Sequence, residues 1–248
     1  MKKIFISFFS VAIGCVGVAN AAVYTWNGAA GDNMWGTSQN WNLNNGYYPQ
    51  SNSDTAIIRP GNEVIVWSST QQYLGATASI ELGAGNTVRF EANSTAVDLK
   101  VSSFTLGGNS MFKLFGSNAI GYGKNFTINY GTFTADSHGL FDANMGGGVL
   151  WTNGRTVTLT GNFDATGLAG SGSITLYDAS QIRHSGGAAV FDVSGISMTK
   201  SDNVDVDIET SGNKVVINYT VAPAVPEPAT ATLSLLALAG VMARRRRQ

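Results

Sequence analysis

The chain is poor in the residues on which disulfide scaffolds, metal sites and many active sites depend. Its 248 residues include one cysteine and two histidines, and only 12% are charged. One cysteine cannot form an intramolecular disulfide. His138 and His184 lack the His-x-x-His and His-Glu-x-x-His spacings of zinc sites, so we expect no metal centre. The sequence shows no motif for a nucleotide, haem or flavin, and it predicts no cofactor.

The pattern of residues does not mark a catalytic centre. A Gly-x-Ser-x-Gly elbow is missing, although a Ser-His-Asp triad assembles in space and spacing alone does not exclude one. Carboxylate pairs for glycoside hydrolysis or lyase chemistry could be drawn from the acidic residues, but nothing selects a pair. Gly146-Gly147-Gly148 is expected to form a turn, because no Lys-Ser or Lys-Thr follows it as in a phosphate loop. We therefore predict no catalytic residues.

Glycine, serine, threonine and asparagine are frequent, which favours short strands joined by tight turns. No amphipathic helix is evident between the two ends of the chain. Short apolar segments predict strands at Glu63–Trp67, Ser79–Leu82, Thr87–Glu91, Val97–Val101, Met111–Phe115, Asn125–Tyr130, Arg155–Thr160, Ser173–Tyr177, Ala189–Val193 and Ile196–Thr199. Alternation around Ser211-Gly212-Asn213 predicts a final hairpin, with Asp205, Asp207 and Glu209 on its outer face. The predicted fold class is all-β.

A weak internal repeat suggests how the strands are arranged. Phe104-Thr-Leu, Phe126-Thr-Ile, Val157-Thr-Leu and Ile174-Thr-Leu follow one another at intervals of 22, 31 and 17 residues. A solenoid with rungs of roughly 20 residues would give such an echo. We therefore predict a single-stranded, right-handed β-helix. A two-sheet jelly-roll sandwich is the alternative, because it fits the same number of strands.

Residues 1–21 have the pattern of a secretory signal peptide. Lys2-Lys3 forms the charged start, Ile4–Val18 the apolar region, and Ala19, Asn20 and Ala21 the small residues before a cut at Ala22. A lipoprotein signal acylated at Cys15 is the alternative, but the residues after Cys15 stay apolar. Cleavage after Ala21 would remove the single cysteine from the mature protein.

The C-terminal end combines a short motif, an apolar run and a basic cluster. The motif is Val225, Pro226, Glu227 and Pro228, the run is Ala229–Ala243, and the cluster is Arg244, Arg245, Arg246 and Arg247. As a transmembrane helix the run would be about 22 Å long, which is short for a hydrocarbon core of about 30 Å. The arginines should stay in the cytoplasm, and the prolines should keep the motif extended for a processing enzyme. A retained weak anchor is the alternative.

These three parts resemble the PEP-CTERM sorting signal of Gram-negative bacteria, over roughly residues 224–248. The resemblance implies that Pro226, Glu227 and Pro228 are recognised by an exosortase-like membrane protease-transpeptidase. It also implies export by the Sec machinery, transient insertion in the inner membrane, and delivery to the cell surface or outside the cell. The family is associated with extracellular polysaccharide and the biofilm matrix.

The body between the ends opens with a tryptophan-rich block, Tyr24–Trp41, which contains Trp26, Trp35 and Trp41. This block resembles the opening segment of bacterial surface proteins with autotransporter-type β-helix passengers. Tryptophan faces stack on pyranose rings, and Asn and Asp side chains bond hydroxyls, so one interpretation is a sugar site. The other is a cap, because the end of a solenoid must be covered.

The body is also acidic. Residues 22–224 include nine basic and fifteen acidic residues, a net charge of −6, because six basic residues lie in the two end segments. This balance argues against nucleic-acid and anionic-lipid partners. Asp205, Asp207 and Glu209 could hold Ca²⁺ through carboxylate oxygens. Because no EF-hand loop or calcium-binding nonapeptide is present, we expect a solvated face there instead.

The sequence therefore predicts a signal peptide at 1–21, an exported domain at 22–222 and a sorting signal at 223–248. The predicted function is that of a non-catalytic structural or adhesive protein of the cell surface or extracellular matrix. One alternative is a carbohydrate-binding module for exopolysaccharide, built on the three tryptophans of the opening block. A further alternative is a polysaccharide lyase or hydrolase on a β-helix.

Overall fold

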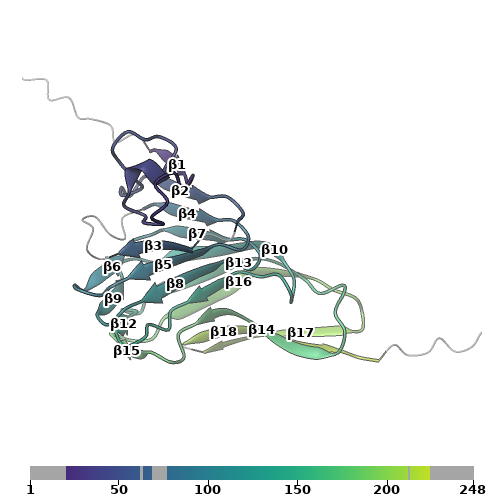
Figure 1. Cartoon of the computed structure of the whole chain (residues 1–248). Helices are drawn as coiled ribbons and strands as arrows, with labels where there is room; N and C mark the ends of the chain where they lie inside the picture. Colours follow the sequence, from purple (N-terminus) through teal and green to yellow (C-terminus); the bar gives the residue numbers. More distant parts are fainter. Residues whose placement is uncertain (1–20, 62–63, 69–76, 212, 224–248) are drawn as a thin grey trace, which may run out of the picture.

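The computed structural model describes residues 21–61, 64–68, 77–211 and 213–223. This part of the chain is built from strands, with one short 3₁₀ helix, η1 (Ser38–Asn40), and no α-helix (Figure 1). The all-β prediction is confirmed. Among the described residues no helix has the length and apolar character needed to span a membrane. The predicted transmembrane helix at 229–243, Ala19, the sorting motif Val225–Pro228 and Arg244–Arg247 all lie outside the described residues.

The strands form three sheets. Sheet 1 contains, in spatial order, β1 (Val23–Thr25), β2 (Thr55–Ile58), β4 (Ser79–Leu82), β7 (Ser103–Leu106), β10 (Phe126–Phe133), β13 (Thr156–Asp164) and β16 (Val190–Thr199). Sheet 2 contains β3 (Val64–Ser68), β5 (Thr87–Glu91), β8 (Met111–Phe115), β11 (Leu140–Asp142), β14 (Ser171–Asp178), β18 (Lys214–Val221) and β17 (Val204–Ser211). Sheet 3 contains β6 (Val97–Leu99), β9 (Ala119–Tyr122), β12 (Val149–Trp151) and β15 (Arg183–Ser185).

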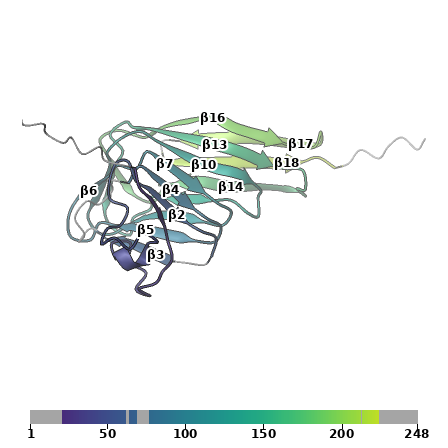
Figure 2. The same ribbon diagram turned by 90° about the horizontal axis from the view of Figure 1, so that it is seen from above.

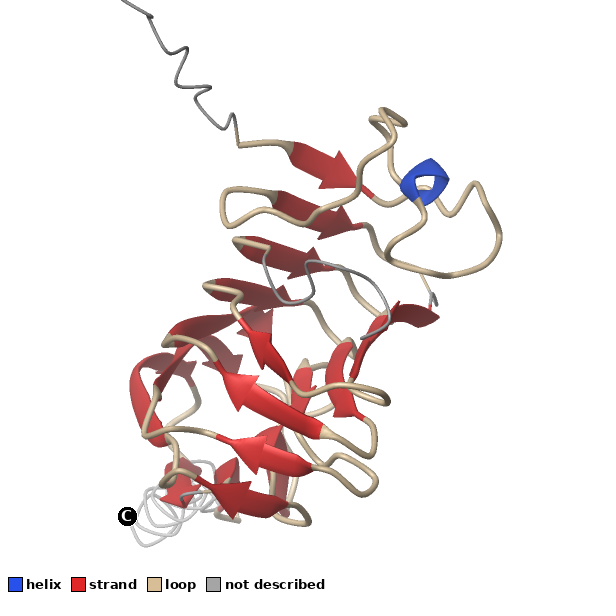
Figure 3. Ribbon diagram, turned by 90° about the vertical axis from the view of Figure 1, so that its left-hand side faces the viewer, coloured by secondary structure: helices blue, strands red, loops and turns tan. Residues whose placement is uncertain are grey.

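The chain passes through the three sheets in rotation. We use the word coil for this stacked arrangement of strands, and not for irregular backbone. From β4 to β15, successive strands enter sheet 1, sheet 2 and sheet 3 in turn, and each turn lies on the previous one (Figures 1 and 3). Neighbouring strands are parallel throughout the coil. Of the named strand pairs in the described residues, only β14–β18 and β17–β18 are antiparallel. A jelly roll would need antiparallel pairing in both sheets, so this topology does not favour the sandwich alternative.

The register of sheet 1 places chemically similar residues one above another. Ala56, Ile80, Phe104 and Ile128 are register partners on β2, β4, β7 and β10, and each is 24 residues beyond the one before. All four side chains are fully buried. The predicted repeat of roughly 20 residues is therefore too short for these turns. The later turns are longer, as the pairing of Ile128 with Leu159 on β13 shows.

The interior of the coil contains a cluster of aromatic rings. The Phe141 ring on β11 lies 5.3 Å from Phe104, 5.4 Å from Phe112 and 5.5 Å from both Phe126 and Tyr177, measured between centroids. Rings at such separations contribute stacking energy in addition to the apolar area that they bury. Because these residues come from sheets 1 and 2, the rings hold the two sheets together across the core.

Glycine is required where consecutive turns of the coil touch at a corner. A Cβ atom on Gly83 would lie 2.5 Å from the backbone nitrogen of Pro60, and one on Gly107 would lie 2.8 Å from that of Ala84. Real side chains do not tolerate such contacts with backbone atoms. The high glycine content of the chain therefore has a structural cause at these corners.

The C-terminal end of the coil differs from its start. The predicted hairpin is confirmed, with β17 and β18 pairing antiparallel and β18 joining β14 at the edge of sheet 2. Figure 2 shows β13 and β16 running over β14 and β18 as two layers. The segments Ala189–Val193 and Ile196–Thr199, predicted as two strands, form the single strand β16. Asp205, Asp207 and Glu209 are exposed on β17, as the alternation predicts.

Two tyrosine hydroxyls meet inside the coil. Tyr122 Oη and Tyr177 Oη are 2.5 Å apart and fully buried, and the nearby Tyr130 hydroxyl donates to the carbonyl oxygen of Leu176 at 2.7 Å. Burial raises the pKa of all three phenols above its ordinary value, because the interior disfavours the phenolate. Each phenol is therefore neutral in the folded protein at pH values where an unfolded tyrosine would ionise.

This arrangement predicts a loss of stability at alkaline pH. Because the pKa values of the three phenols are raised in the folded state, their contribution to the free energy of unfolding is fully present below the unfolded tyrosine pKa of about 10. That contribution is lost as the pH rises above this value. Urea unfolding measured between pH 7 and 11 should show this fall. Tyr122→Phe should cost about 1–3 kcal/mol at pH 7, because the Tyr177 hydroxyl loses its buried partner.

The double variant Tyr122→Phe/Tyr177→Phe is the control. It removes both hydroxyls, so it should be more stable than the single variant and less sensitive to alkaline pH than the unmodified chain. An equally steep alkaline loss in the double variant would contradict the assignment.

Candidate functional site

The tryptophan-rich block forms a compact aromatic cluster at the first turn of the coil. Trp35 and Trp41 are fully buried, and Trp26 is 7% exposed. Trp35 stacks flat on Trp67 of β3, with centroids 4.4 Å apart, and Trp41 meets Trp26 and Trp35 edge-on at 5.2 and 4.8 Å. The indole N–H of Trp35 donates to the carbonyl oxygen of Pro49 at 3.0 Å, and that of Trp41 donates to the carbonyl oxygen of Trp35 at 2.8 Å.

The polar residues of the block are engaged with one another. The Asp32 carboxylate accepts hydrogen bonds from the Thr37 hydroxyl and from the Asn40 amide, each at 2.6 Å. The Asn40 side-chain oxygen in turn accepts from the backbone N–H of Ala30 at 2.8 Å. The bond from Thr37 is the main reason why the pKa of Asp32 lies below its ordinary value. These side chains fix the loop around the tryptophans.

This geometry fits a cap better than a sugar site. A pyranose needs an open indole face, and the faces of Trp26, Trp35 and Trp41 are covered in the folded domain. Sugar binding by these three residues stays a prediction. Their burial does not support it. Their position beside β1 and β3, the first strands of sheets 1 and 2, is that expected of a cap.

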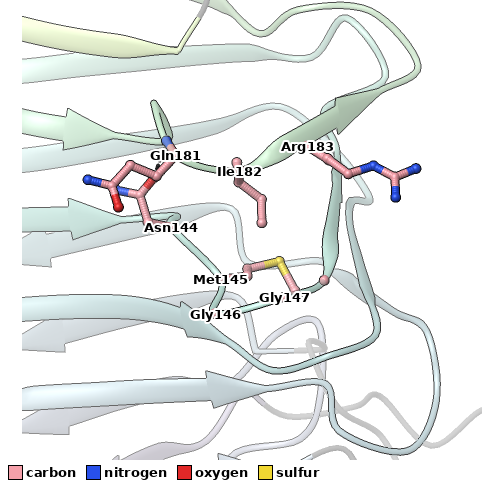
Figure 4. Close-up of a pocket in the computed structure, with 8 residues that line it drawn as sticks. Asn144, Met145, Gly146, Gly147, Gln181, Ile182 and Arg183 are labelled. Carbon is pink, nitrogen blue, oxygen red and sulfur yellow. Dashed lines mark hydrogen bonds between the residues drawn. The ribbon is translucent and has the colours of Figure 1, made fainter.

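The glycine run Gly146–Gly148 lines a shallow hollow of about 270 Å³ between two loops that lead into sheet 3 (Figure 4). Met145 and Ile182 form its apolar part, and the Arg183 side chain extends away from the others in Figure 4. The Asn144 side-chain oxygen accepts from the backbone N–H of Gln181 at 2.8 Å, which joins the two loops. The run lies in a bend between β11 and β12 rather than in a regular turn, and the lining of the hollow includes no carboxylate or histidine.

A second hollow has two carboxylate side chains in its lining. It is lined by Asp136, Asp164 and the surrounding loop residues, and its volume is about 270 Å³. The Thr166 hydroxyl donates to Asp164 at 2.7 Å and lowers the pKa of that carboxyl. A glycosidase general acid needs a raised pKa so that it stays protonated. Asp164 therefore does not suit that role.

The two histidines are not assembled into a triad by the described residues. The Nε2 atom of His184 lies 2.8 Å from the carbonyl oxygen of Ala179, and its Nδ1 atom has no partner there. Burial lowers the pKa of His138, whose Nδ1 atom is also buried without a partner in the described part of the chain. Within those residues no three His, Cys, Asp or Glu side chains converge as metal ligands.

One exposed aromatic residue was not selected from the sequence. Trp151, on β12 of sheet 3, is 47% exposed, whereas the other four tryptophans are buried. In the sequence it is an isolated tryptophan near a glycine run. Its exposure follows from the register of sheet 3, which the sequence did not reveal.

The cap assignment predicts that the Trp41 side chain stabilises the folded domain. Trp41→Ala should destabilise the domain by about 3–5 kcal/mol, because a fully buried aromatic side chain is replaced by a cavity. Trp151→Ala is the matched control and should cost much less, since about half of that side chain is already exposed. Urea unfolding of the two variants checks the difference. Equal losses in both would contradict the cap.

Comparison of the chain with protein-family models, with curated proteins and with solved structures gives no match. The resemblances of the tail and of the tryptophan-rich block therefore stay predictions.

Proposed function

We propose that the protein is an exported, non-catalytic element of the cell surface or extracellular matrix, delivered there by its C-terminal sorting signal. The observation that carries this proposal is the order of the tail: Pro226-Glu227-Pro228, then the apolar run Ala229–Ala243, then Arg244–Arg247. That order suits a substrate of an exosortase-like enzyme, held in the inner membrane until it is cut. The Sec machinery would bring it there.

The start of the folded domain supports a signal-peptide cut before Ala22. The carbonyl oxygen of Ala22 accepts from the backbone N–H of Thr55 at 2.9 Å, and β1 begins at Val23. The backbone nitrogen of Ala22 lies 3.3 Å from the Asp54 carboxylate. A cut at this point would leave β1 intact and would place the new terminal ammonium group beside an opposite charge.

For the body we propose a parallel β-helix with three strands per turn. The rotation of strands through sheets 1, 2 and 3 supports it, and so do the buried residues stacked in register. We assign it a right hand, because connections between parallel strands of one sheet are right-handed in about 98% of cases. Such a coil presents long, flat, polar faces, which suit a structural or adhesive role outside the cell.

The enzyme alternative receives little support from the geometry. Asp136 and Asp164 share a hollow, but hydrogen bonds from Thr166 keep the Asp164 carboxyl acidic. The net charge of −6 on the body gives no reason to expect a nucleic-acid partner.

The sorting proposal predicts where the mature chain ends. In the producing cells, mass spectrometry of the surface or secreted fraction should find a C-terminus near Val225–Pro228, bare or carrying an added group. Replacing Pro226, Glu227 and Pro228 by alanine should leave the chain in the inner membrane with Arg244–Arg247 attached.

Pro223→Ala is the matched control, since it changes a proline that lies outside the motif, and it should be processed normally. Recovery of the unmodified protein with Arg244–Gln248 intact would mean that the tail is a retained anchor and would contradict the proposal.

A further inference from the structure

The exposure of Trp151 calls for a physical explanation. Trp26, Trp35, Trp41 and Trp67 are all buried, whereas Trp151 is 47% exposed in a domain with an extensive apolar interior. Leaving a large indole in water gives up the free energy that burial would provide. An exposed tryptophan on a regular strand is therefore a candidate contact residue for a ligand or a partner.

Register places Trp151 in a row of outward-facing residues that crosses sheet 3. Asp98 on β6 pairs with Gly121 on β9, and Gly121 pairs with Trp151 on β12. Ile120 and Leu150, one position earlier on their strands, are fully buried. Because side chains alternate along a strand, the row of Asp98, Gly121 and Trp151 faces away from the core.

Gly121 is buried beneath its neighbours in this row, because it has no side chain of its own to hold them away. A Cβ atom at Gly121 would collide with the Asp98 carboxylate and would lie 4.0 Å from the Cβ atom of Trp151. The Asp98 carboxylate therefore lies over Gly121, and Trp151 lies next to it in the row. These residues line a hollow of about 230 Å³ together with their neighbours; its lining is Ala96, Val97, Asp98, Ala119, Gly121 and Trp151.

The chemistry of this hollow fits a sugar ring. An indole face packs against the C–H groups of a pyranose, and an ionised carboxylate accepts strong hydrogen bonds from hydroxyls. Ala119 and Gly121 have little or no side chain, so they leave room for the Asp98 carboxylate and for a ring beside Trp151. The volume is below the roughly 300–1,000 Å³ of pockets for drug-sized ligands, so it suits a single ring of a longer chain.

Two observations narrow the ligand. The Asp98 carboxylate and the net charge of −6 on the body would repel uronic-acid polymers. Trp151 is the one large apolar side chain of this row, which also contains Asp98 and Ser185. A stable protein interface, by contrast, buries about 800 Å² per partner around an apolar centre. A neutral glycan therefore fits better than a protein.

We propose that Trp151, Asp98 and Gly121 form a subsite for one pyranose ring of a neutral polysaccharide on the outer face of sheet 3. This site is separate from the tryptophan-rich block. It does not depend on the sorting tail, so each proposal can fail without the other.

Affinity electrophoresis of the full chain tests the subsite. Native gels contain hydroxyethyl cellulose, mixed-linkage β-glucan, xylan, galactomannan or dextran, and gels with alginate serve as the anionic comparison. At least one neutral polymer should retard the protein. Trp151→Ala should lower the affinity for that polymer at least about tenfold, which the gels would show as weaker retardation. Gly121→Ala should lower it as well, because the added methyl group would displace the Asp98 carboxylate.

Tyr47→Ala is the matched control, because Tyr47 is also an exposed aromatic residue, at 58%, but lies outside sheet 3. It should bind as the unmodified chain does. If Trp151→Ala loses its cooperative melting transition, Asp98→Asn carries the test, since it keeps the side-chain shape and removes the charge. It should also weaken binding.

The proposal is overturned if no neutral polymer retards the chain, if alginate alone does, or if the Trp151 and Asp98 variants bind normally. Sedimentation at several protein concentrations tests the remaining interpretation, in which this face contacts another copy of the protein. Self-association that Trp151→Ala abolishes, without any retention by glycans, would assign this face to a protein contact and would also overturn the proposal.

Discussion

Parallel strands that stack in register, turn upon turn, are the constraint on which the rest of the structure depends. The 24-residue spacing of Ala56, Ile80, Phe104 and Ile128 keeps one buried row continuous through four turns. The Phe141 ring and its neighbours then join sheets 1 and 2 across the interior. A coil built in this way has two open ends. The tryptophan cluster lies at the first, beside β1 and β3, and the β17–β18 hairpin extends sheet 2 at the last.

The sequence predicted the five-residue strands β5 and β8 well, split the longest strand, β16, into two, and predicted sheet 3 poorly. Strands such as Thr87–Glu91 and Met111–Phe115 alternate clearly, and their predicted bounds are those of β5 and β8. The strands of sheet 3 have three or four residues and include glycine at Gly121, so period-two alternation is too short to detect. The apparent repeat was in register at one step, because Phe126 pairs with Val157, and out of register at another, because Phe104 pairs with Ile128 rather than with Phe126.

The candidate sites show the same limit. Composition identified the tryptophan-rich block as one unit, but whether its rings face water or the core depends on Trp67, which belongs to a different strand. Trp151 has no neighbouring motif, and its surroundings come from β6 and β9, which precede it in the chain. The tail, by contrast, is read directly from consecutive residues. The sequence therefore predicts the cellular destination of the protein. The exposed face of sheet 3 becomes apparent only from the fold.

The central claim is that the fold buries the tryptophan-rich block and leaves Trp151 open. Brief oxidation of the native full chain with N-bromosuccinimide, mapped by peptide mass spectrometry, tests it most directly. The account predicts rapid oxidation of Trp151 alone, with Trp26, Trp35, Trp41 and Trp67 reacting only after the protein is unfolded in urea. Rapid oxidation of Trp35 or Trp41 in the native protein, or protection of Trp151, would contradict it.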